Sequence, residues 1–137
     1  MKDYNGFSTE ERMIIHNKQK AMGLHVEVAK KPCSICEGSG GFIMCHTEDY
    51  RNLYDVRPIC VECHMKLHVR FSRPGVWIKH LIDLKNSIKP KQWKTVGEYF
   101  YSQKSERFIE LQTIDPATIG EEWYHKLLMT KINLNEI

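Results

Sequence analysis

The order of apolar and polar residues predicts a helix near the start of the chain. Ser8-Thr-Glu-Glu11 has the form of a capping box, in which the two outer side chains each satisfy a backbone N–H at the start of a helix. We therefore expect a helix from Thr9 to Met22, with Gly23 as its stop. Residues 24–31 alternate apolar and polar positions, and this pattern fits a short strand as well as a second helical piece.

The middle of the chain has the pattern of a hairpin that leads into a helix. Phe42–His46 is expected as the first strand and Leu53–Arg57 as its partner, with residues 47–52 as the connecting loop. Ile59–Arg73 then carries apolar and metal-binding side chains three and four positions apart, which is typical of a helix, and Pro74-Gly75 ends it.

The C-terminal part of the chain is expected to be mainly helical. Apolar periodicity predicts helices over residues 76–88, 96–103 and 119–134, and Pro90 and Pro116 interrupt the helical pattern. The 137 residues, 42% of them hydrophobic, suffice for one ordinary domain or for a small metal-stabilised module with helical additions.

The cysteines indicate a structural zinc site in the hairpin region. Four of the five cysteines form two Cys-x-x-Cys pairs, which argues against a disulfide scaffold. Closing the hairpin brings both pairs around one tetrahedral Zn²⁺ ion, whereas two unrelated reduced pairs would leave the hairpin with too little core. The expected zinc ligands are Cys33, Cys36, Cys60 and Cys63.

These elements together predict an α+β fold. Its centre is a small treble-clef zinc core, in which a cysteine knuckle, a hairpin and a helix surround the ion, and helices flank this core on both sides. We expect an N-terminal helical extension (1–32), the zinc-bound core (33–73) and a helical C-terminal region (74–137).

Three histidines indicate a second divalent metal ion. His64 and His68 lie four residues apart and share one face of the predicted helix, while His46 ends the first strand across from them. A zinc ion held by four cysteines needs no further ligand, so the three histidines are candidates for a separate site. Alternatively, His68 is a surface residue and His64 only packs.

The chain resembles the HNH, or ββα-metal, nuclease family in its zinc-stapled, phage-encoded form. The resemblance rests on Cys33-x2-Cys36, the hairpin with Asp55-Val56, and Ile59-Cys60-x2-Cys63-His64, and it covers roughly residues 33–70. It implies one divalent ion, Mg²⁺, Mn²⁺ or Zn²⁺, with His64 as its helix ligand. In this family a strand histidine acts as general base on water, and the ion stabilises the leaving oxygen of the phosphodiester.

The resemblance leaves two alignments of the first strand open. In the alignment without a gap, counted back from Asp49-Tyr50, His46 is a metal ligand together with the two helix histidines. Thr47 then falls at the base position, and because threonine cannot take a proton at neutral pH, the base would be Glu48, the carboxylate of Asp49 or a water.

The second alignment has one extra residue in the loop. Cys45 becomes the first metal ligand and His46 the general base, and a soft thiolate ligand favours zinc or another transition ion. In either alignment Asp55 occupies the position of an Asn that braces the loop. The candidate catalytic residues are therefore His46, Asp55 and His64.

The basic residues are concentrated beside the expected metal sites. Residues 57–94 hold nine Lys and Arg against two acidic residues, whereas residues 105–137 hold three basic and six acidic residues. Such a block is often only a solvated helix face, but beside a metal module it suggests contact with a phosphate backbone. The candidate nucleic-acid contacts are Lys66, Arg70, Arg73, Lys79 and Lys85.

Two classes of function are consistent with these features. The first is a metal-dependent endonuclease that hydrolyses phosphodiester bonds of nucleic acid, with double-stranded DNA as the expected partner. The alternative is a catalytically impaired zinc-binding adaptor that binds nucleic acid or a host protein. No apolar run approaches the roughly 20 residues of a membrane span and no signal peptide is recognisable, so we expect a cytoplasmic protein, in a bacterial host cell if it is phage-encoded.

Overall fold

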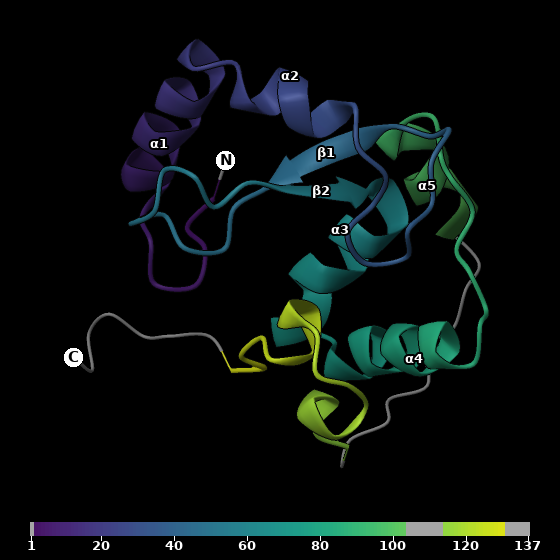
Figure 1. The fold of residues 1–137 in the computed structure, drawn as a ribbon. Coiled ribbons are helices and arrows are strands. Elements are labelled where there is room, and N and C mark those ends of the chain that lie inside the picture. Colours follow the sequence, from purple (N-terminus) through teal and green to yellow (C-terminus); the bar gives the residue numbers. More distant parts are fainter. Residues whose placement is uncertain (1, 104–113, 131–137) are drawn as a thin grey trace.

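The structure, a computed structural model, describes residues 2–103 and 114–130 (Figure 1). Helix α1 (Thr9–Ala21) begins at the expected capping box: the Ser8 hydroxyl accepts from the Glu11 N–H, and the Glu11 carboxylate accepts from the Ser8 N–H, both at 3.1 Å. Helix α2 (Leu24–Ala29) follows directly, so the helical alternative for this segment is the correct one.

A two-stranded antiparallel hairpin forms the described sheet. Strand β1 (Ile43–His46) pairs with β2 (Arg57–Cys60), so that the end of β1 lies beside the start of β2. The first strand was predicted correctly, but the second was placed too early along the chain. Leu53 and Tyr54 form a turn instead, and residues 55 and 56 lie outside any strand, because the Asn52 side chain accepts from the Tyr54 N–H at 3.0 Å and starts a turn there.

Helix α3 (Val61–His68) continues directly from β2, and a 3₁₀ turn, η1 (Val69–Phe71), extends it. The predicted helix is therefore shorter at both ends. Its expected stop, Pro74-Gly75, instead opens α4 (Pro74–Lys85), because proline at the first position of a helix lacks only an N–H that would be unpaired anyway.

The C-terminal region is less helical than predicted. Helix α5 (Val96–Ser102) is present, but the helix expected over 119–134 is wrong for residues 119–130, which contain only the short turn η4 (Trp123–His125), preceded by η3 (Pro116–Thr118). The His125 ring accepts from the Glu122 N–H at 3.1 Å, which ties the segment into a turn. Residues 131–134 of that prediction lie outside the described residues.

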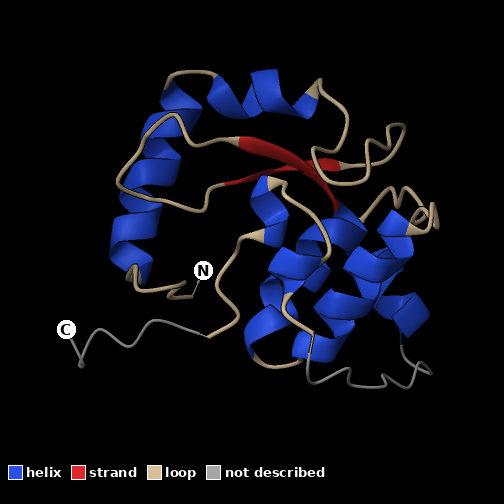
Figure 2. Ribbon diagram, turned by 60° about the horizontal axis from the view of Figure 1, so that its bottom comes forward, coloured by secondary structure: helices blue, strands red, loops and turns tan. Residues whose placement is uncertain are grey.

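The core lies between the hairpin and the helices that surround it (Figure 2). Its fully buried apolar side chains come from β2, α3 and α4, namely Ile59, Val61, Leu67, Trp77 and Leu81. No described helix is long and apolar enough to cross a membrane. The expected three-part division of the chain stays a prediction.

Candidate metal centres

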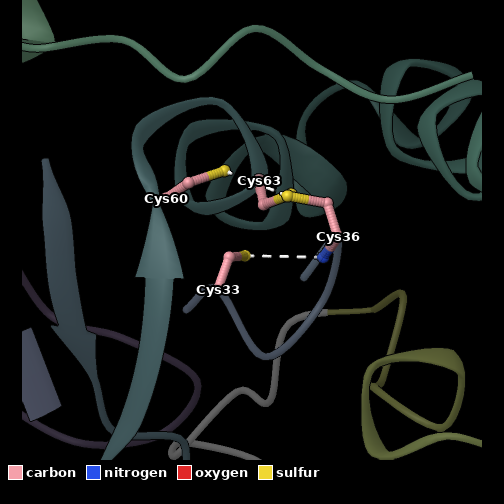
Figure 3. A group of neighbouring side chains, drawn as sticks. All are labelled: Cys33, Cys36, Cys60 and Cys63. Carbon is pink, nitrogen blue, oxygen red and sulfur yellow. Dashed lines mark hydrogen bonds between the residues drawn. The ribbon is translucent and has the colours of Figure 1, made fainter. Parts of the chain in front are cut away.

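The four expected zinc ligands meet in one buried cluster (Figure 3). Cys33 and Cys36 come from the loop that precedes β1, whereas Cys60 ends β2 and Cys63 lies in the first turn of α3. Their four sulfur atoms lie within 4.8 Å of one another, and each cysteine is at most 2% exposed. Closing the hairpin thus joins the two pairs, and the cluster has the donor set of a structural Zn²⁺ site.

The electrostatics of this cluster favour a bound cation. Hydrogen bonding among the sulfur atoms lowers the pKa of the Cys33 thiol and raises the pKa of Cys60 and Cys63. Four thiolates cannot share one buried space because their charges repel one another. A divalent cation removes this conflict and allows all four thiols to lose their protons.

Two further side chains contact the cysteine sulfur atoms. Nε2 of His80, on α4, lies 3.2 Å from Sγ of Cys63, and burial lowers the pKa of His80 to about 3, so its ring is neutral. The amide nitrogen of Gln92 lies 3.4 Å from Sγ of Cys36. Sequence reasoning missed both contacts; the available signal for His80 was a histidine on the apolar face of a predicted helix.

The loop that carries Gln92 packs tightly on the cysteine knuckle. A Cβ atom on Gly41 would lie 2.6 Å from the Trp93 carbonyl oxygen, and one on Gly38 would lie 2.2 Å from the Gln92 amide. The Phe42 N–H also donates to the Trp93 carbonyl at 2.8 Å. These two glycines allow close approach of the backbone, whereas Gly40 adopts a positive φ of 94°, a conformation that favours glycine.

The three predicted histidines also converge. Nδ1 of His46, at the end of β1, lies 3.3 Å from Nε2 of His64, and Nε2 of His68 lies 2.8 Å from the same atom. One ring nitrogen of each histidine lies within 4.8 Å of the others. Burial lowers the pKa of His64 to about 3 and lowers that of His68 as well, so both rings are neutral, which is the form that binds metal ions.

The structure separates Cys45 and Thr47 from this histidine cluster. Neighbouring residues of a strand point to opposite faces, so Cys45 and His46 lie on different sides of β1, and the Cys45 sulfur is not part of the convergent group. Burial raises the pKa of Cys45 to about 11. Thr47 is 1% exposed, and its hydroxyl accepts from the Gln19 amide at 3.0 Å. The structure thus groups His46, and not Cys45, with His64 and His68.

Glu48 connects the histidine cluster to a buried network. One carboxylate oxygen lies 2.6 Å from Nε2 of His46 and accepts from the Tyr4 hydroxyl at 2.7 Å, while Arg70 donates to the other oxygen at 3.0 Å. Burial raises the pKa of Glu48, but the hydrogen bond and charge of His46 and the charge of Arg70 outweigh it, and the net pKa lies below the usual value. A carboxylate on the outer nitrogen of a metal-binding histidine fixes the orientation of the ring.

Arg70 does not lie on the surface, as a nucleic-acid contact would require. The residue is 0% exposed, and besides Glu48 its guanidinium donates to the Tyr4 hydroxyl at 2.8 Å and to the Leu128 carbonyl oxygen, also at 2.8 Å. A phosphate outside the protein cannot reach it. The expectation was wrong because the charged head of an arginine is normally exposed. Here the neighbouring carboxylate and carbonyl oxygens offset the free-energy cost of removing the guanidinium from water.

The other basic candidates lie near or at the surface. Lys66 pairs with Glu62 at 3.4 Å, and Lys79 pairs with Asp83 at 2.8 Å, each four residues along a helix. Arg73 and Lys85 are exposed.

Asp55 holds the loop that connects the two strands. Its Oδ2 atom accepts from the Glu48 N–H at 2.9 Å and from the Asp49 N–H at 2.8 Å, and Arg57 donates to Oδ1 at 3.0 Å. Asp55 therefore braces the loop that carries Glu48. It fixes Glu48 at the distance at which its side chain reaches His46.

Aromatic side chains from both ends of the described chain pack on the histidine cluster. The Tyr4 ring lies 4.8 Å from that of His68 and 5.8 Å from that of His46. Trp123 stacks on His46 with ring centroids 6.3 Å apart, and the Arg57 guanidinium lies 4.2 Å from the Trp123 ring centre. Sequence reasoning missed both aromatic residues, because neither has a local pattern that distinguishes it from a core side chain.

The comparisons with known proteins do not assign a family. No family model matches the chain, and no solved structure matches it. The chain is 27% identical to a curated protein, peptide methionine sulfoxide reductase MsrA of Mycoplasmopsis pulmonis (strain UAB CTIP), over 72% of its own length. It spans 63% of the length of that protein. The site must therefore be interpreted from its own chemistry.

Proposed function

We propose that the protein is a metal-dependent endonuclease of the HNH type, with DNA as its substrate. The observation that carries this proposal is the convergence of three imidazole nitrogens, from the end of β1 and one face of α3, beside a separate cluster of four cysteines. A structural zinc site needs no such histidine cluster. The order of hairpin and helix agrees with a ββα-metal core of treble-clef type.

The residues divide into two sets by the ion that each would hold. The four cysteines fit a structural Zn²⁺, and Nδ1 of His46 with Nε2 of His64 and of His68 fits a second divalent ion. When bound, the second ion would supply positive charge to the oxygen that leaves the phosphodiester. Glu48, opposite Nε2 of His46, keeps the proton of that ring away from Nδ1 and so leaves Nδ1 free to bind.

The candidate proton acceptors of the chain are poorly placed for general-base catalysis. Glu48 uses both oxygens in the buried network, and its pKa is lowered. Asp49 is bound by Arg51 at 2.9 Å, and this hydrogen bond lowers the pKa of its carboxyl. With His46 engaged as a ligand and Thr47 buried, the proposed mechanism uses solvent water as the proton acceptor.

The name of the similar Mycoplasmopsis protein states a reductase activity, and the cysteines of this chain support such an activity less well than the histidine cluster supports a nuclease. Thiol-based reduction needs an accessible thiolate with a low pKa. Cys45, the cysteine outside the cluster, is half-buried, and burial raises its pKa to about 11. The other four sulfur atoms face one another in the buried cluster.

The proposal is tested by incubating the purified, zinc-loaded protein with supercoiled plasmid in added Mg²⁺, Mn²⁺, Ni²⁺ or Zn²⁺, or with no added metal. We expect metal-dependent nicking that His46→Ala and His64→Ala abolish, because each removes one of three ligands. Cys45→Ser, on the same strand but outside the histidine cluster, is the matched control and retains activity. DNA binding without cleavage in every metal would instead identify the protein as an adaptor and would overturn the nuclease proposal.

A further inference from the structure

An open groove runs from the N-terminal segment to the end of α3. It has a volume of about 740 Å³, and Lys2, Tyr4, Arg12, His68 and Phe71 contribute to its walls. This volume lies within the roughly 300–1,000 Å³ that is usual for sites of small ligands. The groove can therefore hold a segment of nucleotide size.

The groove reaches the histidine cluster. His68 belongs to both, and the ring of Tyr4, which also lines the groove, lies 4.8 Å from the His68 ring. A molecule that occupies the groove would therefore lie next to the proposed site of hydrolysis.

Arg12 presents a fixed positive charge on this groove. Its guanidinium lies 5.2 Å from the ring centre of Tyr4 and 5.3 Å from that of Tyr50, and it donates to the Lys2 carbonyl oxygen. Its Nε atom is buried and has no hydrogen-bond acceptor within the described part of the chain.

The acidic residue of the groove is already engaged. One oxygen of Asp3 accepts from the Thr9 N–H at 2.7 Å and from the Thr9 hydroxyl at 2.9 Å, which ties Asp3 to the start of α1. The groove is lined by two basic side chains, Lys2 and Arg12, and by one carboxylate, that of Asp3. The balance of charge favours an anionic ligand.

We propose that this groove binds the DNA strand next to the scissile phosphate, with Arg12 and Lys2 contacting backbone phosphates and Phe71 offering an apolar surface to a base. This inference rests on the proposed function, because it takes the histidine cluster as the site of hydrolysis. Arginine and lysine are the usual contacts to phosphates, and a base stacks on an aromatic ring without sequence preference.

The inference is tested by the binding of a fluorescein-labelled DNA duplex to the zinc-loaded full chain in buffer without added divalent metal, followed by anisotropy over a series of NaCl concentrations. We expect Arg12→Gln and Lys2→Gln each to weaken binding about tenfold and to reduce the slope of log affinity against log salt by about one. Lys18→Gln is the matched control, because it removes the same charge from an exposed position on α1 that does not line the groove.

Lys2→Gln keeps the test valid if Arg12→Gln loses stability, because Lys2 is exposed at the N-terminus. Equal binding by Lys2→Gln, Lys18→Gln and the wild type would overturn the inference, as would wild-type protein that does not bind the duplex.

A second measurement tests the proposed hydrolysis independently of DNA binding in the groove. Hydrolysis of bis(p-nitrophenyl) phosphate in Mn²⁺ reports on the histidine cluster with a diester too small to need the groove. If the wild type hydrolyses this diester while Lys2→Gln and Arg12→Gln bind DNA normally, the groove inference fails and the nuclease proposal stands. If DNA binding depends on both residues but no diester is hydrolysed, the groove is a binding site and the nuclease proposal fails.

Discussion

Nε2 of His46 lies 2.6 Å from a carboxylate oxygen of Glu48, two residues further along the chain. The two residues are held at this distance because Asp55 accepts from the Glu48 N–H and Arg70 binds the second oxygen of the carboxylate. The contact orients the ring so that Nδ1 faces His64. His80 makes a similar contact with the other cluster, because its Nε2 atom lies 3.2 Å from Sγ of Cys63.

Replacing Glu48 by glutamine tests this relationship. We expect Glu48→Gln to lower the affinity for the second divalent ion about 10–100-fold, because loss of such an outer partner typically has this effect. The change also leaves the buried charge of Arg70 without its partner, and breaking a buried pair costs about 3–5 kcal/mol of stability. Titration calorimetry with Mn²⁺ or Zn²⁺, on protein whose cysteine site is already loaded, measures the first effect, and urea unfolding measures the second.

Tyr4→Phe is the matched control for Glu48→Gln. It removes the hydrogen bond from Tyr4 to the carboxylate and the one from Arg70 to the Tyr4 hydroxyl, but leaves the contacts of Glu48 with His46 and Arg70 in place. Its effect on metal affinity should be smaller than that of Glu48→Gln. Unchanged metal affinity in Glu48→Gln would show that the carboxylate does not orient the histidine.

Removing a cysteine ligand should release zinc and unfold the centre of the protein. We expect Cys33→Ser to lose the zinc content of the purified protein and its cooperative thermal transition, because the cysteine pairs join the knuckle to the start of α3. A strong chelator should have the same effect on the wild type. Metal content is measured by atomic emission and unfolding by circular dichroism.

Cys45→Ser provides the comparison for the cysteine prediction. Cys45 lies outside the four-sulfur cluster and has no metal to lose, so zinc content should equal that of the wild type. A Cys33→Ser variant that keeps its zinc and its melting profile would rule out the structural role of the cluster.

Local signals predicted those features that depend on neighbouring residues. The capping box at Ser8 and the two Cys-x-x-Cys pairs are recognisable from a few neighbouring residues, and both formed as expected. The strand predicted to begin at Leu53 was wrong because apolar residues form a strand only where the backbone stays extended. Here the hydrogen bond from the Tyr54 N–H to the Asn52 side chain bends the backbone into a turn. Apolar periodicity also failed in residues 119–130, which pack on the core as turns.

The environment of the histidine cluster could not be predicted from local signals. Arg70 lies 22 residues from Glu48 and 66 residues from Tyr4 in the sequence, and their contacts exist only once the chain has folded. Charge composition suggested that Arg70 faces solvent, whereas the buried carboxylate determines its place. The ligands of a site are thus easier to recognise than the residues that orient them, because only the ligands carry a spacing motif.

Close packing of the knuckle against residues 92 and 93 makes Gly41 sensitive to substitution. In Gly41→Ala the new Cβ would lie 2.6 Å from the Trp93 carbonyl oxygen, which is backbone and must shift. In Gly38→Ala the nearest atoms belong to the flexible Gln92 side chain, which can move away from Cys36. We expect Gly41→Ala to destabilise the protein by about 1–3 kcal/mol, as overpacking typically does, and Gly38→Ala by less. Urea unfolding of both variants measures the difference; equal losses would contradict the prediction.

The half-buried imidazole of His16 should make stability depend on pH. Burial lowers the pKa of His16 to about 4, and the charges of His25, Arg12 and Lys20 act in the same direction. In the unfolded chain the pKa is about 6.5. As the pH falls from about 6.5 to about 4, the unfolded state therefore binds a proton at this position that the folded state excludes, and the free energy of unfolding decreases.

The substitution His16→Gln isolates this contribution, because glutamine can still pair with the Tyr50 hydroxyl that lies 3.3 Å from the His16 ring. Urea unfolding of both proteins over this pH range should show that the free energy of unfolding falls more steeply for the wild type than for the variant. The two slopes against pH should differ by at most the equivalent of one proton bound on unfolding. Parallel curves, with the same difference in stability at every pH, would mean that His16 takes up its proton equally in the folded and unfolded chain.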